Sequence, residues 1–147
     1  MPRIDNSIEI KAPREKVFQY ISDIEAQPQW VKWAKRVELT SPARTGVGAT
    51  DSMLMQVGPQ KQRVEGLVTE YGDGQFFTRR LTKGMDLTER LAVVSYADGS
   101  KVAYSVEYTP PMGPIGKMID MLFMARLFDQ LMKDSLTNLK ERLETPG

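Results

Sequence analysis

Between Val37 and Tyr108, short runs of alternating apolar and polar residues are separated by turn residues. A period of two predicts strands with one buried face, and the short spacing between runs predicts antiparallel neighbours. The predicted turns are Gly46-Val47-Gly48, Gly58-Pro59, Gly72-Asp73-Gly74, Lys83-Gly84 and Asp98-Gly99. The middle of the chain is therefore predicted to be one antiparallel meander.

The turns also predict which side chains lie opposite one another, because loop length fixes the register of a hairpin. The Asp98-Gly99 turn, the strongest hairpin signal in the chain, pairs Leu91 with Val106 and Glu89 with Tyr108. The other turns predict the pairs Met53–Val64 and Asp51–Gly66, Val68–Arg79 and Gly66–Leu81, and Arg79–Glu89 and Phe77–Leu91. The last two pairs require a three-residue loop at Lys83-Gly84-Met85, since a two-residue loop would flip half of the sheet.

All four registers give the same two faces. The predicted inner face consists of Met53, Met55, Val64, Val68, Phe77, Leu81, Leu87, Leu91, Val93, Val102, Tyr104, Val106 and Tyr108. The opposite face carries Arg63, Glu65, Arg80, Thr88, Arg90 and Glu107, which suit water. One apolar face on a meander must be covered by another element.

Two short helices are predicted near the N-terminus, after a strand over Ser7–Lys11. Pro13 suits the first position of a helix, and Val17 and Ile21 follow at helical spacing. Ser22 to Glu25 has the form of a capping box, which predicts the start of the second helix.

A long helix is predicted over residues 115–144, with a wide apolar face and a polar stripe at helical spacing. The stripe consists of Arg126, Gln130, Lys133, Thr137, Lys140 and Glu144, and Asp129 and Lys133 form an i,i+4 pair. The inner face of the sheet is the candidate surface that such a helix would cover. Runs of strand followed by one helix predict an α+β fold.

The opening stretch IEIKAPREKVFQYISDIEAQPQWVKWAKRVEL resembles the START/Bet v 1-like superfamily, also called SRPBCC or polyketide cyclase/dehydrase-like. The far end is similar too, because Pro110–Gly116 leads into the long helix. The resemblance implies a helix-grip fold: a curved antiparallel sheet wrapped around one long C-terminal helix, with two short N-terminal helices. It covers a single domain over residues 1–147, in a superfamily that contains carriers, sensors and enzymes.

Composition narrows the functional classes. The 147 residues carry 20 basic and 19 acidic side chains, which give a net charge of +1. Nucleic-acid binding requires a concentrated positive surface, and this composition does not predict one. The chain has no Cys and no His, which excludes disulfides, thiolate catalysis and the Ser-His-Asp arrangement. We expect no metal and no cofactor. With no signal-peptide pattern and no integral membrane segment, a cytoplasmic protein is expected.

A helix-grip fold implies an internal space between sheet and helix, and its lining would be mostly apolar with few polar groups. Several of the candidate lining residues are methionines, which adapt to ligands of different shape but also fill ordinary cores. The predicted lining is Trp30, Trp33, Met53, Met55, Val68, Phe77, Arg79, Glu89, Leu91, Tyr104, Val106, Tyr108, Met121, Leu122, Ala125 and Phe128. Trp30 and Trp33 could line its entrance or simply pack.

Three polar side chains, Arg79, Glu89 and Tyr108, fall together on the predicted inner face, and Asp51 could join them. A buried carboxylate must be paired or become neutral, so Arg79 opposite Glu89 could form a structural ion pair. The same groups could orient a ligand, or act as acid and base in a cyclisation or dehydration. The sequence leaves both interpretations open.

The leading hypothesis is binding or carriage of a hydrophobic small molecule, such as a lipid, isoprenoid, quinone or polyketide-like compound. The alternative is a polyketide aromatase/cyclase or dehydratase that uses Glu89, Arg79 and Tyr108. A third class is a protein-interaction module with a vestigial cavity. The sequence assigns neither a catalytic residue nor an oligomeric state.

Overall fold

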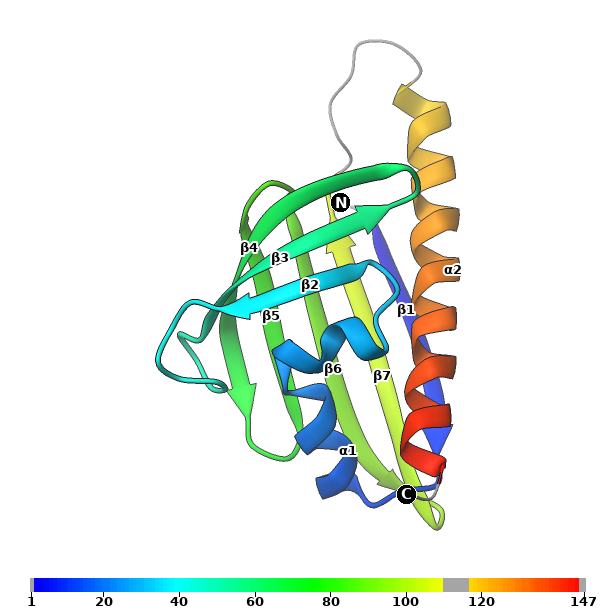
Figure 1. The fold of residues 1–147 in the computed structure, drawn as a ribbon. Helices are drawn as coiled ribbons and strands as arrows, with labels where there is room; N and C mark the ends of the chain where they lie inside the picture. Colours follow the sequence, from blue (N-terminus) through cyan, green and yellow to red (C-terminus); the bar gives the residue numbers. More distant parts are fainter. Residues whose placement is uncertain (1, 110–116, 146–147) are drawn as a thin grey trace.

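The structure is a computed structural model that describes residues 2–109 and 117–145. Its seven strands form one antiparallel sheet in the order β1-β7-β6-β5-β4-β3-β2 (Figure 1). The elements are β1 (Arg3–Ile10), α1 (Arg14–Ile21), η1 (Ile24–Gln29), β2 (Ala34–Leu39), β3 (Thr50–Val57), β4 (Gln60–Gly72), β5 (Phe76–Lys83), β6 (Leu87–Tyr96), β7 (Gly99–Tyr108) and α2 (Lys117–Glu144).

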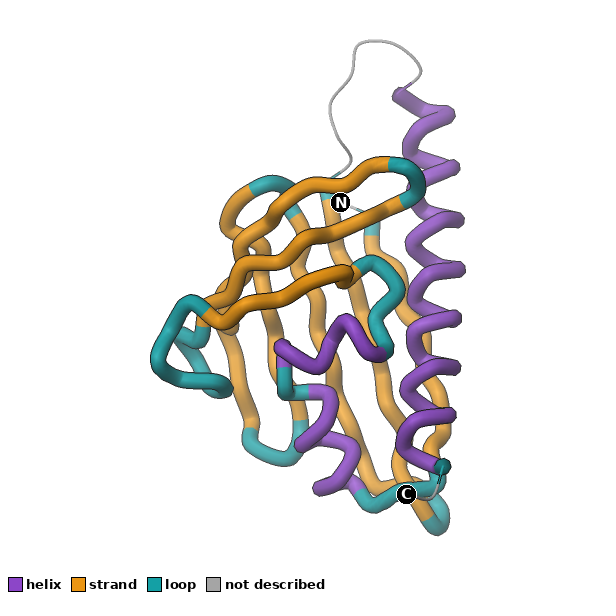
Figure 2. Tube along the Cα trace, viewed as in Figure 1, coloured by secondary structure: helices purple, strands orange, loops and turns teal. Residues whose placement is uncertain are grey.

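The sheet is curved, and the long helix α2 runs beside its β1 edge, where the two elements are in contact (Figures 1 and 2). The short helices α1 and η1 lie in front of the sheet near the C-terminal end of α2 (Figure 2). This arrangement confirms the predicted α+β helix-grip fold. Within the described residues, no helix is long and apolar enough to cross a membrane.

Three of the four predicted registers are confirmed. Met53 pairs with Val64 across β3–β4, Val68 with Arg79 across β4–β5, and Arg79 with Glu89 across β5–β6. The three-residue loop between β5 and β6 therefore exists, and the predicted face of Glu89 is correct. Every residue of the predicted inner face is buried.

The predicted β6–β7 register is wrong by two residues. Glu89 lies opposite Val106, not Tyr108, and the hairpin turns at Ala97 and Asp98. Ala97 adopts the positive φ of 51° that this turn needs. Gly99 is instead the first residue of β7, where an added Cβ would collide with the carbonyl oxygen of Ile10. Since the error is an even number, both faces of the sheet keep their residues.

The capping-box prediction at Ser22 is wrong as well. Ser22 is the C-cap of α1, and its hydroxyl donates to the carbonyl of Gln19. Its φ of −81° and ψ of −10° are helical, whereas an N-cap residue is extended. Asp23 occupies the N-cap of η1 without a side-chain cap bond, and Pro13 is the N-cap of α1, not its first residue.

The described part of α2 agrees with the predicted helix. Its buried side chains are Phe128, Met132, Ser135, Leu136, Leu139 and Leu143. On the polar stripe, Lys133 Nζ lies 2.8 Å from Asp129 Oδ2, as the i,i+4 spacing predicts. Residues 110–116, which include the Gly-Pro-Ile-Gly segment before the helix, lie outside the described residues.

Candidate functional site

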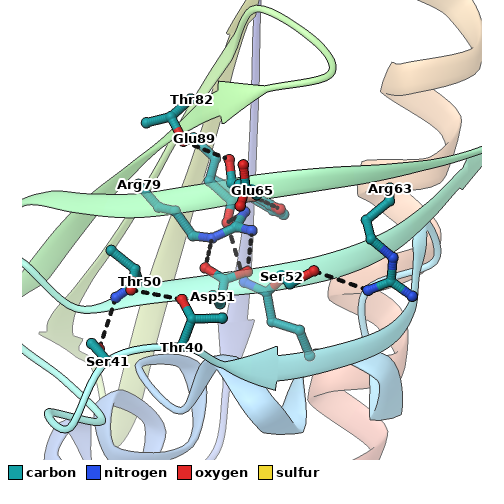
Figure 3. Close-up of polar contacts among 12 residues, drawn as sticks. Thr40, Ser41, Thr50, Asp51, Ser52, Arg63, Glu65, Arg79, Thr82 and Glu89 are labelled. Carbon is teal, nitrogen blue, oxygen red and sulfur yellow. Dashed lines mark hydrogen bonds and ion pairs between the residues drawn. The ribbon is translucent and has the colours of Figure 1, made fainter.

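A group of five buried polar residues, which we call the core polar cluster, joins four strands and η1. Its centre is Arg79 on β5, whose Nε and terminal nitrogen donate to the two carboxylate oxygens of Asp51 on β3, at 2.9 and 2.7 Å (Figure 3). A third guanidinium nitrogen lies 3.4 Å from Glu89 Oε1 on β6. All three side chains are at most 3 % exposed, so their charges are paired inside the fold.

Tyr104 and Gln27 complete the cluster around Glu89. The Tyr104 hydroxyl donates to Glu89 Oε2 at 2.9 Å, and Gln27 Nε2 donates to Oε1 at 3.1 Å. Burial and the adjacent Glu89 carboxylate raise the pKa of Tyr104 well above its usual value. Tyr104 therefore remains a protonated donor at neutral pH.

The guanidinium of Arg79 keeps its charge although it is buried. Burial lowers the pKa of Arg79, but its hydrogen bond to Asp51 and the charge of Glu89 outweigh this effect, so the net direction is upward. Arg79 reaches β3 by crossing β4 at Gly66, where an added Cβ would lie 2.5 Å from the guanidinium. Glycine inside a strand thus provides the space for this close approach.

The sequence predicted part of this cluster. Arg79, Glu89 and Asp51 are in contact, but Tyr108 is not a member, because the true β6–β7 register moves it two residues away from Glu89. Tyr104 takes its place, diagonally across from Glu89. Gln27 was missed because it lies on a short 3-10 helix, where no strand or helix periodicity marks a polar residue as buried.

A pocket of about 670 Å³, which we call the end pocket, opens beside the N-terminal half of α2. It lies between this helix, the β3–β4 hairpin, the β5–β6 turn and the end of β7. Its lining residues are Met55, Val57, Pro59, Gln60, Gln62, Gly84, Met85, Asp86, Thr109, Phe123, Met124 and Leu127. A mostly apolar lining with a few polar groups is typical of small-molecule sites.

Only Met55 of the predicted cavity residues is among the described lining of the end pocket. The others that the structure buries are Trp30, Trp33, Met53, Val68, Phe77, Arg79, Glu89, Leu91, Tyr104, Val106, Tyr108 and Phe128. Trp30 and Trp33 do not border this pocket. Their ring centroids lie 6.0 and 5.9 Å from the ring centroid of Tyr104, within the packed core.

The predicted residues on α2 have different positions. Ala125 is half-buried, and the side chain of Met121 lies outside the described residues. Leu122 is 64 % exposed and is not among the described residues that line the end pocket. It precedes the buried Phe128 by six residues, which is about 240° around a helix with 3.6 residues per turn. Phe123 and Met124, which the lining prediction lacked, border the end pocket instead.

Solved structures share this fold at low sequence identity. TTHA0849 from Thermus thermophilus superposes with a TM-score of 0.83 at 19% identity, over 97% of each chain. A START superfamily protein from Mycobacterium smegmatis has a TM-score of 0.73 at 18% identity, again over 97% of each chain. The di-domain ARO/CYC BexL from the BE-7585A biosynthetic pathway has a TM-score of 0.79 at 12% identity, over 99% of this chain and 51% of BexL.

No curated protein matches the chain. The family described as "Polyketide cyclase / dehydrase and lipid transport" matches residues 1–144, nearly the whole sequence. This match agrees with the resemblance of the N-terminal stretch and with the helix-grip architecture. The chain therefore belongs to the polyketide cyclase/dehydrase and lipid transport family, and it has the START/Bet v 1-like fold.

Proposed function

We propose that this protein binds a hydrophobic small molecule, such as a lipid, isoprenoid, quinone or polyketide-like compound, in the end pocket. The observation that carries the proposal is the pocket itself, whose volume of about 670 Å³ suits a small organic ligand. Three methionines border it, Met55, Met85 and Met124, and their flexible side chains adapt to different ligand shapes.

The alternative, a cyclase or dehydratase that uses Arg79, Glu89 and Tyr108, has less support. A catalytic acid or base must come within hydrogen-bond reach of its substrate. Arg79 and Glu89 are at most 1 % exposed, and their polar atoms are occupied by Asp51, Tyr104 and Gln27. Neither residue borders the end pocket. The cluster is better explained as a structural network.

Two adjacent residues of α2 provide a matched test of ligand binding. Phe123 and Leu122 are both 64 % exposed, but only Phe123 lines the end pocket. We expect the neutral fluorophore N-phenyl-1-naphthylamine to bind at one saturable site. Phe123→Gln should weaken this binding roughly tenfold, because the ring loses apolar contact with the ligand.

Leu122→Gln is the control, and it should leave the affinity unchanged. Both variants should melt close to the parent, since each removes an exposed side chain. Equal affinities for the two variants would place the binding site elsewhere. Fluorophore binding that appears only as the protein unfolds would refute the proposed function.

A further inference from the structure

The β3–β4 hairpin forms one wall of the end pocket. Met55 pairs with Gln62 and Val57 with Gln60 across the two strands, and all four residues line the pocket. Strand residues two apart point to the same face, so Gln60 and Gln62 share the face of the buried Val64. The inner face of β4 therefore continues from the core into the pocket, where its side chains change from apolar to amide.

The facing wall belongs to α2. Among the described residues of this helix, those that line the pocket are Phe123, Met124 and Leu127. The two walls approach each other at the hairpin turn, since a Cβ added to Gly58 would lie 3.5 Å from Leu127 Cδ2. A molecule in the pocket would therefore have amide groups on one side and apolar side chains on the other.

The polar lining residues outside the hairpin, Asp86 and Thr109, are bonded to each other. The Thr109 hydroxyl donates to Asp86 Oδ2 at 2.9 Å, and its backbone N–H donates to the Asp86 carbonyl at 2.9 Å. Both donors of Thr109 are thus used within the fold. The two glutamines are exposed as well as lining the pocket, so a ligand there can reach them.

The type and spacing of these two side chains indicate what they would bind. An amide donates to a carbonyl, accepts from a hydroxyl and carries no charge, whereas the outer face of the same segment carries the exposed, charged Lys61 and Arg63. Residues two apart on a strand are separated by roughly 7 Å. Gln60 and Gln62 can therefore bind two neutral oxygens that lie at a similar separation along one side of a ligand.

We propose that the end pocket takes an apolar ring compound that carries two oxygens, as hydroxyl or carbonyl groups, along one edge, and that Gln60 and Gln62 bind these oxygens. The opposite, apolar edge of the compound would pack against the α2 wall. A rigid ring system holds two oxygens apart without the entropy cost of ordering a flexible chain. This inference rests on the proposed function and names its ligand class.

Two isomeric probes test the position of the oxygens. 2,7-Dihydroxynaphthalene carries both hydroxyl groups along one edge, whereas 2,6-dihydroxynaphthalene carries them on opposite edges. Competition against N-phenyl-1-naphthylamine should show that the parent protein binds the 2,7 isomer at least about fivefold more tightly. The reason is that one hydroxyl of the 2,6 isomer would lie against the apolar wall and lose its hydration without a new hydrogen bond.

A double variant, Gln60→Met with Gln62→Met, keeps the length of both side chains and removes both amides. It should still bind the fluorophore, and it should bind the two isomers equally well. Lys61→Met is the control, because Lys61 lies between the two glutamines on the other face of β4 and is not among the described lining residues. This control should keep the preference of the parent for the 2,7 isomer.

The outcomes separate the inference from the proposed function. If the folded parent does not bind N-phenyl-1-naphthylamine, the proposed function fails and the inference with it. If the fluorophore binds but the 2,7 isomer has no advantage, or neither isomer competes, the inference is overturned while the proposed function stands. A preference that survives in the double variant would also overturn the inference, because the amides would not be its source. The comparison of the isomers on the parent protein decides the matter even if the double variant does not fold.

Discussion

The core polar cluster and the end pocket differ in how their polar groups are partnered. In the cluster, Arg79 is paired with two carboxylates and Glu89 receives three donors, all within the buried core. In the end pocket, apolar side chains surround a few polar groups, among them Gln60, Gln62 and Thr109. A closed, paired network stabilises a fold, whereas an open, mostly apolar pocket is suited to bind a ligand.

The largest effect should come from removal of α2, which lines the end pocket and contributes several buried side chains to the core. A chain truncated after Gly116 loses the buried side chains Phe128, Met132, Leu136, Leu139 and Leu143. Each contributes roughly 1.5–3 kcal/mol, against a typical total stability of about 5–15 kcal/mol. The truncated chain should therefore show no cooperative thermal transition by circular dichroism. A monomer that still melts cooperatively would contradict the packing of α2.

Within the core polar cluster, Asp51→Ala should have the greatest cost. It leaves the Arg79 guanidinium buried with only the longer contact to Glu89, and breaking a buried pair typically costs about 3–5 kcal/mol. Urea denaturation would measure this loss of unfolding free energy. Arg63→Ala is the control, because this exposed arginine bonds only Ser52 among its described contacts, and it should cost well under about 1 kcal/mol. Equal costs for the two variants would show that the cluster is not structural.

Glu89→Gln should have a smaller effect and sharpen the contrast between the two regions. The amide keeps the shape but loses the charge that faces Arg79, so unfolding free energy should fall by about 1–3 kcal/mol. Binding of N-phenyl-1-naphthylamine should be unchanged, because Glu89 does not border the end pocket. An unchanged stability combined with weaker fluorophore binding would reverse the roles that we assign to the two regions.

The sequence predicted the fold well because its strongest signals are local. Alternating strands and short turns determine which residues face inward, and even the two-residue error in the β6–β7 register left both faces unchanged. The same error was decisive for the site, because it placed Tyr108 beside Glu89, where the structure has Tyr104. Which side chains touch depends on the exact pairing of residues between two strands. The alternation of apolar and polar residues does not determine this pairing.

The position of the pocket could not be read from the sequence for a different reason. An apolar side chain that lines a pocket has the same pattern as one that fills a core, so Met53 and Met55 looked alike. The structure separates them: both are buried, but only Met55 borders the end pocket.

In the core polar cluster, by contrast, Gly66 carried a recognisable signal. A glycine inside a strand marks the close approach of another group, here the Arg79 guanidinium.

The methionine methyl groups offer the most direct test of the central claim, that ligands bind in the end pocket and not within the core. Met55, Met85 and Met124 line the pocket, whereas Met53 and Met132 are buried in the core and serve as internal controls. Titration of methyl-labelled protein with N-phenyl-1-naphthylamine, followed by NMR, should shift the methyl signals of the first three and leave the other two in place. The largest shifts at Met53 and Met132 would contradict the account, because they would locate the ligand between the sheet and the buried face of α2.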